Sequence, residues 1–410
     1  MSASGVEPTE LDGCQTADRR HAERPPSQTG GTCEVAILTP PGRGAVATIS
    51  VAGPQATAQV ASLFRPAAGR PLSDFPCGRI VYGRWAVSAA AGEEVVVCRR
   101  AADEVEIHCH GGRLAARTIV DSLVASGARE MSWQGFARRQ AVGRIEAEAR
   151  VALAAARTER AAAVLLDQLR GGLRSSLMEA LTDLRCGNTA KAAAILGELE
   201  QHAQTGLHLA EPWRVVLTGR PNVGKSSLIN AVLGFERCIV HVEPGTTRDV
   251  VTAHTALDGW PVELADTAGL REGTDEIEIA GVQRARQQLQ QADLVVLVFD
   301  LSAPWTGADE ALLAEWPGAL VAHNKCDLVP ALRPGRPPGL AVSAAKGMGI
   351  DTLVHEVARR LVPEPPRPAA AVVFTQPQFQ AVRAARSALA AGNDGEAASL
   401  LAELLASRGR

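Results

Sequence analysis

The chain has 410 residues, a length that corresponds to about two to four domains, each with a core of its own. Apolar residues make up 46% and charged residues 21%, as in ordinary globular proteins, and no run of about eighteen apolar residues predicts a membrane span. The formal net charge of -3 excludes a general electrostatic attraction to nucleic acid. Eight cysteines without a C-x-x-C pair argue against a disulfide framework or a zinc site and favour a cytoplasmic location.

The first part of the chain is predicted to be a disordered tail followed by a small α+β domain. Residues 1–31 are polar and lack the apolar core of a secretory signal. In residues 32–128, turn residues separate short β-like runs and two helical stretches. The predicted strands are Val35–Leu38, Ala45–Val51, Arg79–Tyr82, Glu94–Cys98 and Val105–His110, and the predicted helices lie near Gln55–Leu63 and Arg113–Val124.

The rest of the chain is predicted to hold a helical domain in two parts with an α/β domain between them. In the first part of the helical domain, residues 129–210, the stretch 137–208 has helical spacing with breaks at Gly171-Gly172 and Gly187-Asn188, which indicates two or three long helices. In residues 211–364, strands alternate with helices, as in a parallel doubly wound sheet. A Pro-rich linker, Pro363–Pro368, leads to a last helical piece, Pro377–Ser407, so residues 365–410 are expected to be the second, truncated part of the helical domain.

Three of the four lysines of the chain lie in short motifs, and the first motif is a phosphate loop. The sequence GRPNVGKS, residues 219–226, follows the apolar run Arg214–Thr218 and precedes the helical run Ser227–Leu233. A glycine-rich loop between a strand and a helix turns backbone N–H groups toward a phosphate at the positive end of the helix dipole. Lys225 would reach the β- and γ-phosphates, and the Ser226 hydroxyl would bind Mg²⁺. The expected contacts are Asn222, Val223, Gly224, Lys225, Ser226 and Ser227.

Two further segments are predicted to respond to the terminal phosphate. In PGTTRD, residues 244–249, Thr247 is expected to complete the Mg²⁺ shell, with Thr246 beside it. The predicted strand Val262–Leu264 precedes DTAG, residues 266–269, whose carboxylate can meet Mg²⁺ through water and whose glycine N–H can contact the γ-phosphate. The expected contacts in this segment are Asp266, Thr267, Ala268 and Gly269.

The last two motifs are predicted to select the base. In NKCD, residues 324–327, the Asp327 carboxylate can accept hydrogen bonds from N1–H and N2–H₂ of guanine. Adenine has no such donor pair and would leave the carboxylate unsatisfied, at about 1–3 kcal/mol per lost partner. In SAAK, residues 343–346, the backbone N–H near Ala344 would face guanine O6. The five motifs therefore predict GTP and GDP as ligands, with base contacts at Asn324, Lys325, Asp327, Ser343, Ala344 and Ala345.

The residue that orients the attacking water is not evident from the motifs. Ras-like enzymes use a glutamine directly after the Asp-x-x-Gly turn. Here that position is Leu270, which offers no hydrogen bond. Glu276 and Glu278 follow, and either could act through a bridging water, although carboxylates in this spacing are also typical of a solvated helix.

With these motifs, the chain resembles the tRNA-modification GTPase family called MnmE or TrmE. The resemblance is strongest across residues 219–300 and extends to TPPGRG, residues 39–44, and VEIHCHGG, residues 105–112. It implies a P-loop G domain inserted in an α-helical domain, preceded by an α+β domain that resembles a folate-binding domain and mediates homodimer formation. It also implies hydrolysis assisted by K⁺, with tRNA and a modification protein as partners and no membrane.

The resemblance assigns further roles by position. Asn222 would supply a side-chain ligand to K⁺, and the backbone at His241, Glu243 and Thr246 would complete the cage. Ser226 and Thr247 would hold Mg²⁺. Glu278 corresponds to the catalytic carboxylate of the family, so the catalytic residues expected are Glu278 and Lys225.

The chain departs from the family at positions linked to the modification chemistry. Members end in a tail with a functional cysteine, and this sequence has no cysteine after Cys326. Of the family's folate contacts Glu106 is kept, a basic position is Arg144 and an arginine has become Ser50, so folate binding is left open. Two hypotheses follow: a GTPase whose K⁺- and Mg²⁺-dependent hydrolysis drives a conformational switch in tRNA wobble-uridine modification, or a divergent paralogue that acts as a GTP-dependent binding switch for another partner.

Overall fold

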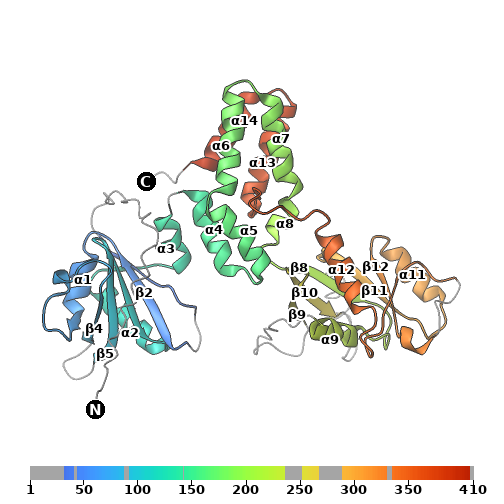
Figure 1. The fold of residues 1–410 in the computed structure, drawn as a ribbon, viewed down its shortest axis with the longest axis horizontal. Helices are drawn as coiled ribbons and strands as arrows, with labels where there is room; N and C mark the ends of the chain where they lie inside the picture. The colour runs from blue at the N-terminus through green and yellow to red at the C-terminus, as the bar shows by residue number, and fades with distance from the viewer. Residues whose placement is uncertain are drawn as a thin grey trace, which may run out of the picture. The chain divides into compact units, whose positions relative to one another are not determined.

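The computed structural model describes residues 32–40, 44–86, 92–141, 143–235, 252–266, 289–329 and 335–406. It divides into two compact units, one up to Phe136 and the other from Ala137 (Figure 1). The predicted tail, residues 1–31, lies outside the described residues. Within these ranges, no helix combines the length and the apolar character needed to span a membrane.

The first unit is a sheet covered on one face by two helices. The strand order is β3-β4-β5-β6-β2-β1-β7, antiparallel except for the β1–β7 pair. Alternate residues of β2, such as Ile49 and Val51, pack with Ile119 and Leu123 of α2 in the core. The elements are β1 Glu34–Ile37, β2 Val46–Ala52, α1 Ala56–Leu63, β3 Phe64–Pro66, a 3₁₀ turn at Leu72–Asp74, β4 Ile80–Ala86, β5 Gly92–Ala101, β6 Glu104–His110, α2 Arg113–Ala125 and β7 Arg129–Glu130.

The α+β expectation for this region is confirmed. All five predicted strands and both helices are present, with ends shifted by a few residues. The short strands β3 and β7 were not predicted, because runs of three and two residues carry no measurable alternation.

The helical region is divided more finely than the predicted two or three long helices, so that prediction is wrong. The breaks at Gly171-Gly172 and Gly187-Asn188 are present, and further breaks separate α3 from α4, α4 from α5 and α7 from α8. The Thr158 hydroxyl accepts a hydrogen bond from Ala161 N at 3.2 Å and so starts a new helix. The helices are α3 Trp133–Gln140, α4 Arg144–Ala155, α5 Glu159–Leu169, α6 Gly172–Arg185, α7 Thr189–Gln201 and α8 Ala203–Leu207.

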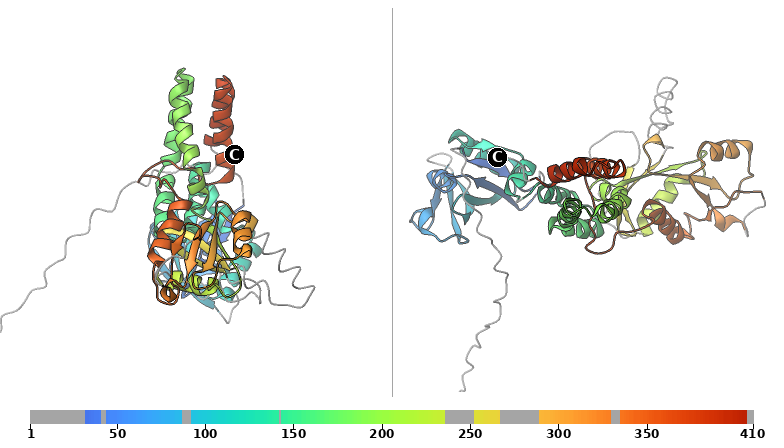
Figure 2. Two further views of the ribbon diagram at one scale, coloured as in Figure 1. Left: turned by 90° about the vertical axis from the view of Figure 1, so that its right-hand side faces the viewer. Right: turned by 90° about the horizontal axis from the view of Figure 1, so that it is seen from above.

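Two C-terminal helices pack against this region (Figures 1 and 2). α13, Gln376–Ala390, lies against α7, and α14, Asp394–Leu405, lies against α6. Two fully buried glutamines bind the segment that precedes α13. Gln168 donates to Ala370 O at 3.0 Å and accepts from Val372 N at 3.1 Å, and Gln378 accepts from Phe374 N at 3.0 Å. Buried amides with both ends paired hold an extended segment in one register.

The α/β region contains a sheet in the order β13-β12-β11-β8-β10-β9. All its described pairs are parallel except β9–β10, a hairpin that the expectation of a parallel sheet missed. Because successive residues of β11 point to opposite faces, Val296 and Val298 pack toward α9 and α12, and Leu297 packs toward α11. The elements are β8 Trp213–Thr218, α9 Lys225–Phe235, β9 Thr252–Leu257, β10 Trp260–Asp266, β11 Leu294–Asp300, α11 Gly307–Glu315, β12 Leu320–Asn324, a 3₁₀ turn at Cys326–Leu328, β13 Leu340–Ala341 and α12 Ile350–Leu361.

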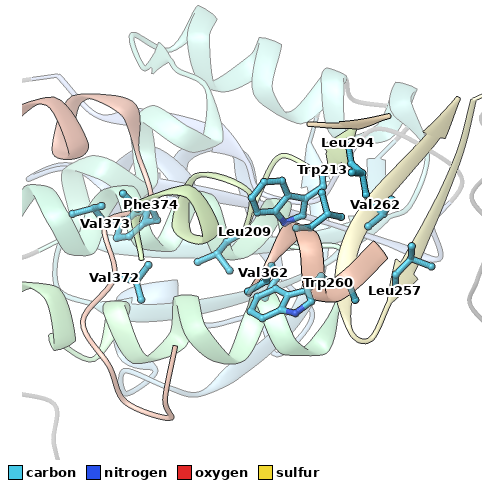
Figure 3. Close-up of a cluster of buried hydrophobic side chains, with 14 of the residues drawn as sticks. Leu209, Trp213, Leu257, Trp260, Val262, Leu294, Val362, Val372, Val373 and Phe374 are labelled. Atoms are coloured by element: carbon cyan, nitrogen blue, oxygen red, sulfur yellow. The ribbon is translucent and has the colours of Figure 1, made fainter. Parts of the chain in front are cut away.

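One end of this sheet is continuous with the core of the helical region. Trp213, Trp260 and Leu294, the first residues of β8, β10 and β11, belong to one buried cluster with Leu209 and Val362 (Figure 3). The cluster also contains residues 372–374, which the buried glutamines hold. The three strands therefore begin in a shared core and end at the opposite edge of the sheet.

Replacing Trp260 with alanine should lower the free energy of unfolding by about 3–5 kcal/mol, because the indole is almost fully buried and its loss leaves a cavity. Urea unfolding followed by circular dichroism measures the change. Met348→Ala is the control, since this side chain is 51% exposed and its loss should cost less than about 0.5 kcal/mol. Equal losses of stability in the two variants would contradict the burial of Trp260 in this shared core.

Candidate functional site

Polar side chains end four neighbouring parallel strands of the α/β sheet. Thr218, Asp266, Asp300 and Asn324 are the last residues of β8, β10, β11 and β12. Asp300 is the register partner of Asn324, and Asp266 is the partner of Leu217. The carboxyl ends of parallel strands form one edge of a sheet, where ligands of α/β proteins usually bind. The structure therefore brings the described parts of the predicted motifs to this edge.

The phosphate loop connects β8 to α9 through unusual backbone conformations. Gly219 has φ +155°, and a Cβ there would lie 2.3 Å from Val298 O on β11. Asn222 has φ 61°, a conformation in which asparagine is enriched among non-glycine residues. Lys225, the first residue of α9, is buried, and its Nζ donates to Gly219 O and Arg220 O, both at 3.1 Å. The ammonium is thus held against the carbonyl groups of the loop itself.

Two of the three residues expected near Mg²⁺, Ser226 and Asp266, lie together. The Ser226 hydroxyl, in the first turn of α9, hydrogen-bonds to Oδ2 of Asp266 at the end of β10. Hydroxyl and carboxylate oxygens suit a hard cation such as Mg²⁺, and a metal there would be next to Lys225. The donor set of the described residues fits the group that the motifs predict.

The Asn324 side chain joins the phosphate loop to the base-side loops. This residue is buried, and its Nδ2 donates to Val223 O at 2.8 Å. Its Oδ1 accepts from Ala344 N at 3.1 Å. Gly224, with φ +92°, leaves room for the amide, because a Cβ would lie 2.4 Å from Asn324 Nδ2. This close approach is the reason that glycine is required at position 224.

The base-side residues adjoin this amide. Asp327 is exposed in the 3₁₀ turn, and Ser343 is buried and accepts from Lys346 N at 3.1 Å. The sequence placed the Ala344 N–H opposite guanine O6, whereas in the structure it donates to Asn324. A contact from Ala344 to O6 would require this hydrogen bond to be shared or replaced. Ala345, the third residue expected here, is exposed beside it.

Lys325 links the two sides of the site. One of its partners, Asp300, was not predicted from the sequence. The Lys325 Nζ donates to Asn222 O at 2.9 Å and to Asp300 Oδ2 at 2.6 Å. Burial raises the pKa of the Asp300 carboxyl, but hydrogen bonds from Lys325 and Ser302 outweigh it, and the pKa lies below its ordinary value. The sequence signal that could have identified Asp300 is a carboxylate at the end of an apolar strand, because ligands bind at the strand ends of such sheets.

Several expected site residues lie outside the described residues, so their roles stay predictions. They are His241, Glu243, Thr246, Thr247, Thr267, Ala268, Gly269 and Glu278, together with Leu270 and Glu276.

Of the two strand positions linked to folate by resemblance, Ser50 does not fit that group. Ser50 and Glu106 are register partners on β2 and β6. The Ser50 hydroxyl is fully buried without a hydrogen-bond partner in the described structure, and it cannot supply the positive charge of the expected arginine. The Glu106 carboxylate lies 3.7 Å from both Arg100 and His108.

Comparison with known proteins agrees with the description of the first unit and with that of the α/β region. The family described as 50S ribosome-binding GTPase matches residues 214–325, and the family described as GTP-binding protein TrmE N-terminus matches residues 34–142. The tRNA modification GTPase MnmE of Chloroflexus aurantiacus is 37% identical over 87% of this chain and 90% of its own length. The chain belongs to the MnmE family. The MnmE proteins of Heliobacterium modesticaldum and Symbiobacterium thermophilum are 34% and 37% identical over 81% and 79% of the chain, and about four fifths of each relative is covered.

Membership of the MnmE family makes the chain a GTPase with a TrmE-type N-terminal domain, as the motifs predicted. The phosphate loop, Asp266 and the first two residues of the NKCD motif lie within the matched G domain. The geometry of this edge is therefore that of a GTP-binding domain.

Replacing Asp327 with asparagine should exchange the base preference of the site. An amide cannot accept from both N1–H and N2–H₂ of guanine, so GDP should bind at least about tenfold more weakly. Xanthosine diphosphate should gain affinity, because the new NH₂ can donate to its 2-oxo group. Titration calorimetry with GDP, ADP and xanthosine diphosphate measures both effects. Asp351→Asn, at an exposed carboxylate on α12, is the control, and an unchanged order of affinities in Asp327→Asn would contradict the assignment.

Proposed function

We propose that this MnmE-family protein hydrolyses GTP with Mg²⁺ and K⁺ and uses the nucleotide state as a switch in tRNA wobble-uridine modification. The observation that supports it most is the proximity of Lys225, Ser226 and Asp266 where β8 and β10 end. A buried ammonium beside a hydroxyl–carboxylate pair suits a metal-bound triphosphate. The similarity to proteins named tRNA modification GTPase MnmE supports the substrate.

In the proposed chemistry, the residues of the chain bind and orient the triphosphate. Lys225 contacts the β- and γ-phosphates, and Ser226 and Thr247 hold Mg²⁺, which when bound supplies positive charge to the phosphate oxygens. Glu278 orients the attacking water through a bridging water. Asn222 stands in the phosphate loop with its backbone fixed by Lys325, and its side chain would bind K⁺ together with the backbone of His241, Glu243 and Thr246.

The proposed domain organisation is a G domain, residues 211–364, inserted between two parts of one helical domain, residues 129–210 and 365–410. The packing of α13 and α14 against α7 and α6 supports it, as do the contacts of Gln168 with residues 370–372. We further propose that residues 32–128 mediate homodimer formation. Movements of the G domains would then reach the helical domain through the shared cluster at the start of β8, β10 and β11.

Hydrolysis should be faster in KCl than in NaCl at equal ionic strength, and Glu278→Ala should lower kcat at least about a hundredfold while GDP affinity changes little. Phosphate release and titration calorimetry measure the two quantities. Glu315→Ala, which removes an exposed carboxylate on α11, is the matched control. Equal rates in both salts, or full turnover in Glu278→Ala, would contradict the catalytic assignment.

The role in tRNA modification has its own test. Deleting the gene should reduce the modified wobble uridines, measured by mass spectrometry of tRNA nucleosides, and the wild-type gene should restore them where Lys225→Ala does not. The chemistry of Ser50 favours the second candidate, a GTP-dependent binding switch for another partner. Unchanged wobble uridines in a strain without another family member, together with a partner retained only with a GTP analogue, would favour that candidate.

A further inference from the structure

Asp300 ends the most apolar strand of the sheet with a charged side chain. The strand β11 reads LVVLVFD, and its first six residues are buried. The Asp300 side chain is 17% exposed and has partners on both oxygens. Its Oδ1 accepts from Ser302 N at 2.8 Å and from Ser302 Oγ at 2.6 Å, and its Oδ2 accepts from Lys325 Nζ at 2.6 Å. A carboxylate bound in this way has one orientation.

The loop that follows Asp300 has further contacts besides its hydrogen bonds to the carboxylate. Leu301 N donates to Asn324 O at 2.8 Å and continues the contact between β11 and β12. The Arg336 guanidinium donates to Leu301 O at 3.3 Å and also to Ala303 O, and it lies over the Trp305 ring. The position of Asp300 therefore does not depend on its ion pair with Lys325.

Lys325 lies between two fixed acceptors. Its backbone is in the left-handed region at φ 65°, which is uncommon for lysine and points to a local constraint. Its ammonium bridges Asp300 on β11 and the backbone carbonyl of Asn222 in the phosphate loop. A lysine side chain loses conformational entropy on being ordered, and a charge-assisted hydrogen bond offsets a comparable free energy.

We propose that Asp300 is a positioning residue for guanine-nucleotide binding that acts through Lys325. The carboxylate orders the lysine before the ligand arrives, so that the NKCD turn and the phosphate loop have their binding geometry in the free protein. Ordering a site in advance raises affinity by removing part of the cost of binding. The inference rests on the proposed nucleotide site and adds a residue outside its motifs.

Asp300 and Asp327 are expected to differ in their effect on base recognition. Asp327 is expected to contact the exocyclic amine of guanine, which hypoxanthine lacks. Asp300 contacts Lys325 and Ser302 and is not expected to contact the exocyclic amine. Loss of Asp300 should weaken GDP and inosine diphosphate by the same factor, whereas loss of Asp327 should change their ratio.

The experiment measures nucleotide affinity of the full chain by titration calorimetry for Asp300→Ala, Asp300→Asn, Lys325→Met and the double variant Asp300→Ala/Lys325→Met. We expect about tenfold weaker GDP binding in Asp300→Ala, a smaller loss in Asp300→Asn, and the same ratio of GDP to inosine diphosphate as in the wild type. The KM for GTP should rise while kcat stays within about twofold. The double variant should bind no more weakly than Lys325→Met alone.

Three outcomes would overturn the proposal. They are wild-type GDP affinity in Asp300→Ala, weaker GDP binding by the double variant than by Lys325→Met, and a changed ratio of the GDP and inosine diphosphate affinities. Glu315→Gln is the control for loss of an exposed carboxylate, and circular dichroism checks folding, with Asp300→Asn replacing Asp300→Ala if the alanine variant does not fold. Absence of GDP binding by the wild-type protein would instead reject the nucleotide site itself.

Discussion

The buried amide of Asn324 links the segments on which the nucleotide site depends. One end of the amide binds the phosphate loop at Val223, and the other end binds the backbone of Ala344. Since both ends are used, neither loop can move alone without leaving a buried polar group unpaired, at about 1–3 kcal/mol. Lys325 extends the same connection from the phosphate loop to the end of β11. These contacts join the base side and the phosphate side into one unit.

The sheet connects this unit with the helical region. β8, β10 and β11 begin in the buried cluster around Trp213 and Trp260 and end at the nucleotide edge. The guanidinium of Arg160, on α5, lies 4.6 Å from the Trp260 ring and donates to Asp258 O at 2.8 Å. A densely packed core transmits displacement with little compression. The fold therefore provides a direct physical connection between the strand ends at the site and the helices that flank it.

Among the described residues, the sequence predicted the motifs of the site but not every contact around them. The phosphate loop, Asp266 and the NKCD motif were predicted because their glycines, lysines and carboxylates stand at the fixed spacing that nucleotide recognition requires, and the strand ends bring them to one edge. Asp300 escaped prediction, since a single acidic residue after an apolar strand has no motif around it. One of the unexpected divisions of the helices before Trp213 is made by a threonine cap that composition does not reveal. The antiparallel strand β9 depends on the turn at Asp258-Gly259, which was not recognised as a hairpin.

By itself, the sequence determined the ligand class and the family, because phosphate and guanine recognition require particular atoms at short separations along the chain. The tertiary structure alone decided which distant groups meet. Gln168 binds the backbone about 200 residues later, Asn324 reaches Val223 across the sheet, and Asp300 meets Lys325. Local patterns specify helices, strands and loops, whereas these contacts arise from strand order and packing, which no short stretch of sequence encodes.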